Sequence, residues 1–174
     1  MSRVFEVIKA RRSIRRYEPK PIPREDLEKI FEAARLAPSA KNLQPWRFVV
    51  VTDPEKKKEL AKACWNQMFI ADAAVIVVAL SDPNLSPRWH DKDTMIAIEH
   101  MVLVAADLGY GTCWIGAFDE NEVKKIVKAP ENLKVVAVLP IGYPAESPPQ
   151  RPRKKLEEIF FHEEYGKQLD LSKI

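Results

Sequence analysis

The order of apolar and polar residues predicts helices and short strands in alternation. A segment that opens at residues 21–23 and closes at Pro38 repeats apolar side chains at helical spacing, namely Leu27, Ile30, Phe31 and Ala34. This spacing predicts an amphipathic helix that is bounded by prolines. Residues 47–52 form a short run that is rich in β-branched side chains, which predicts a strand. Asp53 and Pro54 then supply the N-cap and the first position of another helix.

The second half of the chain continues this alternation. Residues 74–80 form a continuous apolar run, which predicts a strand buried on both faces near the middle of a sheet. Residues 93–108 carry apolar side chains over more than half of the helix circumference, so we expect a largely enclosed helix that ends at Gly109. Asp119, with Glu122 three residues on, predicts the capped start of a short helix over 119–127, and a buried strand over 135–141 follows. By itself, this alternation suggests a parallel, doubly wound sheet.

The length and composition predict one folded domain. The chain has 174 residues, of which 46% are hydrophobic and 30% are charged, so it can bury a core and stay soluble. After Gly142 the sequence becomes proline-rich and basic, and it looks too extended to pack by itself. We therefore expect a single domain over 1–174, in which residues 143–174 form a C-terminal arm that crosses to a partner subunit.

The charge and cysteine content argue against several classes of function. The 28 basic and 25 acidic residues give a net charge of +3 and are scattered, which favours small anions over nucleic acid. Cys64 and Cys113 match no zinc or iron–sulfur spacing, and the three histidines form no ligand pattern, so no metal is predicted. The N-terminus lacks signal-peptide features and no apolar run reaches membrane-spanning length. We therefore expect a cytoplasmic protein that does not bind a membrane.

Four arginines and a serine lie close together near the end of a predicted helix, in the run Arg11-Arg12-Ser13-Ile14-Arg15-Arg16-Tyr17. Guanidinium groups match the oxygens of a phosphate, and a serine hydroxyl adds a further donor. A run of this kind is also common on a solvated surface. Taken alone, the cluster is compatible with both interpretations.

A second polar segment lies between two prolines, just before the first predicted strand. It reads Pro38-Ser39-Ala40-Lys41-Asn42-Leu43-Gln44-Pro45-Trp46. Loops of this composition often hold ligands. The alternative is an ordinary helix–strand connection in which the Asn and Gln side chains satisfy backbone groups.

In their order along the chain, these segments closely resemble the flavin-dependent nitroreductase family. The resemblance begins with Arg-Arg-Ser-x-Arg, an amphipathic helix and Pro-Ser-x-x-Asn-x-Gln-Pro-Trp. It continues in Leu108-Gly109-Tyr110-Gly111-Thr112-Cys113-Trp114-Ile115-Gly116, which is similar to the family's glycine-rich segment beside the flavin ring. It ends in Arg151-Pro152-Arg153-Lys154-Lys155-Leu156-Glu157-Glu158, which is similar to its phosphate-side motif. The four motifs extend over nearly the whole chain.

The resemblance implies a different fold from the one that the alternation suggests. It implies an α+β, three-layer sandwich in which a mixed, mainly antiparallel sheet is flanked by helices. It also implies an intertwined homodimer, with the helix over 93–108 at the interface and each flavin site formed by both chains.

The same resemblance implies a flavoprotein oxidoreductase. FMN would be the cofactor, NADH or NADPH would donate a hydride to flavin N5 and leave, and a nitroaromatic, quinone or similar small molecule would then accept the electrons in a ping-pong cycle. No side-chain nucleophile or general base is required. Two alternatives that keep the flavin stay open: a non-catalytic flavin-binding or regulatory protein, and a family member with a different flavin redox reaction. A third alternative is a basic interaction module, which would be colourless.

Positions in the motifs carry the expected cofactor contacts. The resemblance places the two ends of the chain on the FMN phosphate and Arg15 near the pyrimidine edge of the flavin, where its charge would tune the reduced ring. It places residues 38–40 of the second subunit on the ring, Asn66 or Gln67 at its polar edge, and the backbone of residues 114–116 near N5. The full expected set is Arg11, Arg12, Ser13, Arg15, Pro38, Ser39, Ala40, Asn42, Asn66, Gln67, Trp114, Ile115, Gly116, Arg151 and Arg153.

Overall fold

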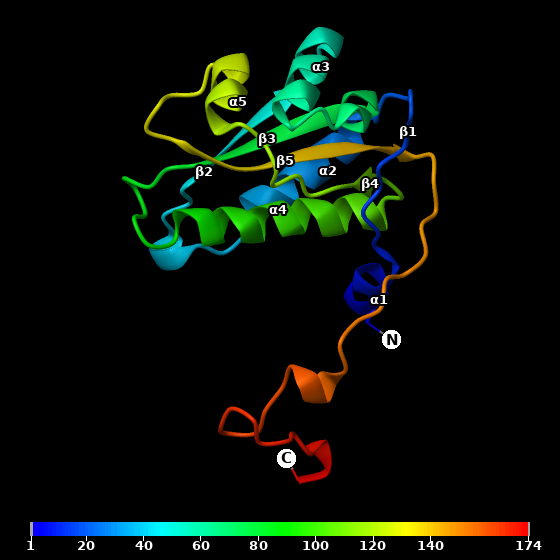
Figure 1. The fold of residues 1–174 in the computed structure, drawn as a ribbon, viewed down its shortest axis with the longest axis vertical. Coiled ribbons are helices and arrows are strands. Elements are labelled where there is room, and N and C mark those ends of the chain that lie inside the picture. The colour runs from blue at the N-terminus through cyan, green and yellow to red at the C-terminus, as the bar shows by residue number, and fades with distance from the viewer. Residues whose placement is uncertain (1, 174) are drawn as a thin grey trace.

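The computed structural model describes residues 2–173 and arranges them as a sheet between two layers of helices, with an extended C-terminal arm (Figure 1). The α-helices are α1 (Arg3–Ala10), α2 (Arg24–Arg35), α3 (Pro54–Ala63), α4 (His90–Asp107) and α5 (Glu120–Val127). The strands are β1 (Tyr17–Glu18), β2 (Trp46–Val51), β3 (Val75–Ser81), β4 (Gly111–Thr112) and β5 (Lys134–Pro144). The short 3₁₀ helices are η1 (Ala40–Asn42), η2 (Met68–Asp72), η3 (Leu156–Glu158) and η4 (Leu171–Lys173).

The sheet is built from antiparallel pairs. Its strand order is β1-β5-β3-β2, and β4 pairs with β5 beside this path. All four strand pairs are antiparallel, while an isolated bridge between Ser13 and Thr112 is parallel. The sandwich implied by the resemblance is therefore confirmed, and the parallel, doubly wound sheet suggested by alternation alone is wrong. Alternation shows which segments form strands, but it does not show the direction in which they pair.

The strand β3 lies between β5 and β2, and all seven of its residues are buried. This confirms the prediction of a central strand from its continuous apolar run. Its side chains alternate between two cores. Val75, Val77 and Ala79 pack into the core beneath α2 and α4, whereas Ile76, Val78 and Leu80 pack into the core beneath α3 and α5. Figure 1 shows these two helix pairs on opposite faces of the sheet.

The helix ends follow from local chemistry. The Asp53 side chain accepts a hydrogen bond from the Lys56 N–H at 2.9 Å and caps α3, as predicted. The Asp119 carboxylate caps α5 in the same way. The helix α4 begins three residues before the predicted start, at His90, and Gly109 follows its end with a φ of +88°, a conformation that favours glycine.

The helix α4 is enclosed on one side only. Ile98, Met101 and Val102 are buried against the sheet and its neighbours, but Met95 is 45% exposed and Ile96 is 40% exposed. The prediction of a largely enclosed helix therefore holds for the face toward the sheet. Because the apolar stripe is wider than the surface that one chain can cover, part of it stays open in the single chain.

The C-terminal arm leaves the rest of the chain after β5. That strand extends to Pro144, so the first two residues of the predicted arm still pair with β1. Beyond it, the chain runs past α1 and ends well away from the sheet (Figure 1). Most of the arm's side chains are exposed, including the apolar residues Leu156, Ile159, Phe160, Tyr165 and Leu171.

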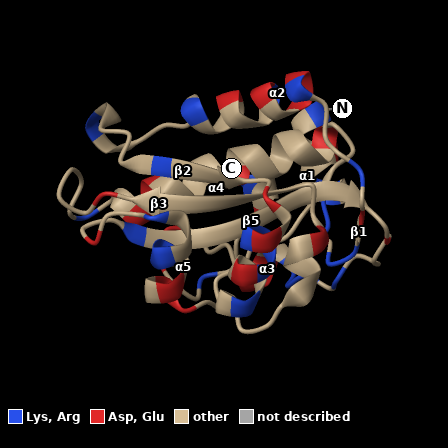
Figure 2. Cartoon of the chain, turned by 90° about the horizontal axis from the view of Figure 1, so that it is seen from above, with Lys and Arg blue, Asp and Glu red and all other residues tan. Residues whose placement is uncertain are grey.

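Charged residues of both signs are mixed over the helices, while the strands are largely uncharged (Figure 2). Ion pairs three or four residues apart account for much of this pattern, such as Arg24 with Glu28 and Lys58 with Glu55. These pairs are exposed and contribute little stability each. Within residues 2–173, no helix combines the length and apolar character needed to cross a membrane.

Candidate functional site

A cavity of about 420 Å³ brings together residues from both ends of the chain. Its N-terminal side contains Arg11, Arg12, Ser13 and Arg15, and its C-terminal side contains Arg151 and Arg153. We call these six residues the arginine cradle. All six belong to the cofactor-binding set expected from the sequence, with Arg11, Ser13, Arg151 and Arg153 expected at the phosphate and Arg15 at the flavin ring. The structure places the six around one cavity.

The N-terminal half of the cradle begins where α1 ends. The Arg12 Nη1 donates hydrogen bonds to the carbonyl oxygens of Lys9, Ala10 and Arg11 at 2.7, 3.0 and 2.8 Å. These carbonyls carry the partial negative charge of a helix C-terminus, which a guanidinium group stabilises. One nitrogen of Arg12 is therefore occupied in holding the end of α1, whereas among residues 2–173 the Arg11 guanidinium has no such partner.

The segment after Arg12 packs directly on β4. The Ile14 N–H donates to the Thr112 carbonyl at 2.9 Å, and Ser13 forms a bridge with the same residue. A Cβ atom on Gly111 would lie 2.6 Å from Ile14 Cγ1 and 2.8 Å from Ile14 Cβ. The absence of a side chain at Gly111 therefore allows Ser13 to reach its place in the cradle.

We predict that Gly111→Ala destabilises the fold by about 1–3 kcal/mol, because the base of a β-branched side chain cannot rotate out of the way. Ile14 would move outward and displace Ser13. Thermal unfolding measures the first effect and FMN titration the second. Gly116→Ala is the control for stability, since a Cβ at that position has nothing within 4 Å. Equal melting temperatures for the two variants would show that β4 does not confine Ile14.

Two hydrogen bonds join the N-terminal arginines to the start of the arm. The Arg15 N–H donates to Glu146 Oε1 at 2.5 Å, and the Ala145 N–H donates to the Arg16 carbonyl at 2.9 Å. Glu146 was not predicted from the sequence. Its partner is 131 positions away, and no local pattern marks such a contact. These bonds fix the direction in which the arm departs toward Arg151 and Arg153.

The electrostatics of the cavity suit a phosphate. Lys9 and the five arginines of the cradle contribute six cationic side chains, against one carboxylate, Glu99. The Glu99 carboxylate accepts a hydrogen bond from Trp114 Nε1 at 3.1 Å. Several guanidinium groups and a hydroxyl can surround a dianion with charge-assisted hydrogen bonds. The residues present therefore fit the phosphate end of FMN.

The groups behind the cradle are held in their neutral forms. Burial raises the pKa of the Cys113 thiol, and the charges of Arg15 and Arg11 only partly oppose this effect. Burial also raises the pKa of the Tyr17 hydroxyl, which donates a hydrogen bond to the Ile14 carbonyl at 2.9 Å. Neither group therefore adds a negative charge that would repel a bound phosphate.

The expected ring-contacting residues form two further groups, outside the cradle cavity. Pro38, Ser39, Ala40 and Asn42 lie at the N-terminal end of α4, where the Ala40 N–H donates to Asp93. Asn66 and Gln67 follow α3, and Gln67 Nε2 donates to the Cys64 carbonyl at 2.9 Å and to the Ala117 carbonyl at 3.4 Å. That second bond places Gln67 beside the expected segment Trp114, Ile115 and Gly116.

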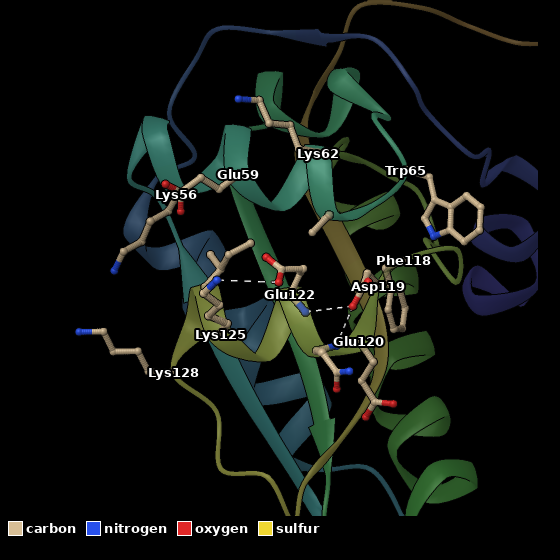
Figure 3. Close-up of a pocket in the computed structure, with 13 residues that line it drawn as sticks. Lys56, Glu59, Lys62, Trp65, Phe118, Asp119, Glu120, Glu122, Lys125 and Lys128 are labelled. Carbon is tan, nitrogen blue, oxygen red and sulfur yellow. Dashed lines mark hydrogen bonds and ion pairs between the residues drawn. The ribbon is translucent and has the colours of Figure 1, made fainter.

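The larger hollow of about 1110 Å³ lies elsewhere, between α3 and α5 (Figure 3). Figure 3 shows lysines and carboxylates interspersed around it, with Trp65 and Phe118 at one end. Lys125 pairs with Glu122 at 3.9 Å. This hollow contains none of the residues expected from the sequence, and its mixed charges do not favour an anion in the way the cradle does.

Comparison with known proteins finds similarity over most of the chain. The sequence model described as "Nitroreductase family" matches residues 8–83 and 65–143. A nitroreductase family protein of Clostridium novyi NT is 38% identical, with a TM-score of 0.79, and the match covers 96% of this chain and 97% of that structure. The NADPH:FMN oxidoreductase of Vibrio harveyi, in a structure complexed with NAD+, is 28% identical with a TM-score of 0.88, over 98% of this chain and 81% of the other. The iodotyrosine deiodinase of Thermotoga neapolitana is 26% identical over 90% of this chain and 96% of its own length.

Proposed function

Because the chain belongs to the nitroreductase family, we propose that it is an FMN-dependent oxidoreductase. In this proposal NADH or NADPH supplies the electrons, and a nitroaromatic, a quinone or a similar small molecule accepts them in a ping-pong cycle. The observation that carries the proposal is the arginine cradle, in which both ends of the chain line one cationic cavity. Bound FMN would supply the two-electron redox chemistry, and the protein would supply binding, orientation and electrostatics.

Within this proposal the cradle residues have different tasks. Arg11, Ser13, Arg151 and Arg153 hold the phosphate, while Arg12 mainly secures the end of α1 and adds its positive charge. Arg15 also lines the cradle cavity, and its backbone N–H donates a hydrogen bond to Glu146. Its guanidinium group stabilises the negative charge that a flavin gains on reduction.

We also propose a homodimer in which each flavin site contains residues of both chains. The single chain leaves apolar side chains exposed on three elements, which is unusual for a small monomer. Val4, Phe5 and Ile8 are 62%, 56% and 50% exposed on α1, and Leu156, Ile159 and Phe160 are 66%, 52% and 51% exposed on the arm. Met95 and Ile96 of α4 add to this surface. A second copy that covers these residues could bring its own residues 38–42 to the flavin ring.

Spectroscopy of the purified protein tests the proposal. We expect visible flavin absorption bands that pass into the filtrate after denaturation, because the cofactor is bound noncovalently. We also expect steady-state oxidation of NADH or NADPH in the presence of a quinone or nitroaromatic acceptor. A protein that is colourless and does not bind added FMN would contradict the proposal.

The same assay separates the two alternatives that keep the flavin. A protein that retains FMN but does not oxidise either nicotinamide would be a flavin-binding or regulatory protein. Iodotyrosine belongs among the acceptors to be tested, because one relative carries the name of iodotyrosine deiodinase. Turnover with that compound alone would indicate a different flavin redox reaction in the same fold.

A further inference from the structure

Asp93 is a buried carboxylate near the start of α4. The residue is only 3% exposed, and its Oδ2 atom accepts a hydrogen bond from the Ala40 N–H at 3.1 Å. Burying a carboxylate costs free energy unless hydrogen bonds or charges compensate for the lost water. The N-terminal end of α4 supplies part of this compensation. The Ala40 N–H supplies a bond that reaches across 53 positions to another segment.

The segment that Asp93 holds has an unusual backbone. Lys41, Asn42 and Gln44 have φ values of 52°, 56° and 51°, in the left-handed region that residues other than glycine adopt at a cost. Several hydrogen bonds lie within the segment. The Ser39 Oγ accepts from the Gln44 N–H at 2.9 Å, and the Gln44 side chain donates to Asn42. These internal bonds set the shape of the turn, and the bond to Asp93 attaches the turn to α4.

We propose that Asp93 is a positioning residue of the flavin site, which fixes residues 38–42 in the conformation that packs against the flavin ring. This inference rests on the proposed function, because it takes these residues as ring contacts. The bond to Ala40 restrains the backbone at the centre of the segment. Asp93 acts through this segment and does not itself touch the cofactor. Its effect should therefore concern the ring and not the phosphate.

This division gives Asp93 a signature that the arginine cradle does not share. Riboflavin has the same ring system as FMN but lacks the phosphate. Loss of a ring contact should weaken the binding of both ligands by the same factor. Loss of a cradle arginine should weaken the binding of FMN and leave riboflavin almost unchanged.

A merely structural role would be to stabilise the N-terminal turn of α4. Asp91 provides the matched control, because it lies in the same turn and its carboxylate accepts from the Lys92 N–H and pairs with Lys92, away from residues 38–44. Asp91→Ala removes the same charge from the same helix end. Asp93→Asn keeps an oxygen that can accept the Ala40 N–H. Asp93→Ser keeps a polar side chain that is too short to reach it.

The experiment titrates FMN and riboflavin into the flavin-free full-length protein and follows the flavin fluorescence. We expect Asp93→Ala and Asp93→Ser to raise both dissociation constants roughly ten-fold, as for the loss of a hydrogen bond to a charged group. Asp93→Asn should restore most of the affinity, and Asp91→Ala should bind both flavins as the wild type does. If Asp93→Ala does not fold, Asp93→Ser carries the test.

A second measurement needs no flavin. Trypsin can cleave after Lys41, which is exposed within the restrained segment. Asp93→Ser should increase the rate of this cleavage in the flavin-free protein, whereas Asp91→Ala should not. Unchanged affinity for both flavins in Asp93→Ser, an equal loss in Asp91→Ala, or a loss confined to FMN would overturn the inference. A wild-type protein that binds neither flavin would instead refute the proposed function.

Discussion

Replacing Arg11 and Arg153 together by alanine should weaken FMN binding by about a hundred-fold or more. Each guanidinium group that bonds a phosphate contributes about 1.5–3 kcal/mol, and the double variant loses one from each end of the chain. Riboflavin, which lacks the phosphate, should bind to the variant and to the wild type with similar affinity. Fluorescence titration with both flavins measures the two effects in one experiment.

The matched control is Arg16→Ala combined with Lys154→Ala. This control also removes one positive charge from each of the same two segments, but neither residue lines the cradle. A general loss of electrostatic attraction would lower FMN affinity in both double variants, and higher salt would diminish the difference from wild type. If the Arg11 and Arg153 variant keeps its FMN affinity, or if the control loses as much, then the phosphate does not lie in the cradle.

Hydrophobic spacing predicted most of the helices and strands, but it did not predict how the strands pair. The apolar run that becomes β3 and the caps at Asp53 and Asp119 are local signals, and the structure confirms them. The direction of strand pairing depends on contacts between distant segments, which hydrophobic spacing does not encode. Only the resemblance to a family provided it. Hydrophobic spacing alone also did not show the uncovered face of α4, because a spacing pattern does not show how much of a helix one chain can cover.

The same division applies to the candidate site. The cradle arginines were expected because they occur in short motifs near the two ends of the chain, and these ends meet in one cavity. Glu146 and Asp93 were missed because each acts on a backbone N–H far away in the sequence. A contact between a carboxylate and a distant backbone N–H leaves no recognisable pattern in the sequence. Residues that position others are therefore found from contacts, while residues that bind a charged ligand can be found from motifs.

The proposed dimer leads to the second large effect. Replacing Ile159 and Phe160 together by aspartate should convert the dimer into monomers. In a symmetric dimer each substitution occurs twice, and each buried side chain of this size contributes about 1.5–3 kcal/mol. Four such sites correspond to a rise in the dimer dissociation constant of at least about four orders of magnitude. Light scattering during size-exclusion chromatography should give twice the 19.9 kDa chain mass for the wild type, and the single mass for the variant.

The control and a second readout separate this effect from unfolding. Val50→Asp places one aspartate on an exposed apolar position of β2, at the opposite edge of the sheet from β1, and should leave the mass unchanged. The monomeric variant keeps every residue of its own cradle, so any loss of FMN affinity measures what the second chain contributes. We expect riboflavin affinity to fall as well, because residues 38–42 of the partner subunit would no longer cover the ring. A variant that remains dimeric, or a wild type that is monomeric, would contradict the role assigned to the arm.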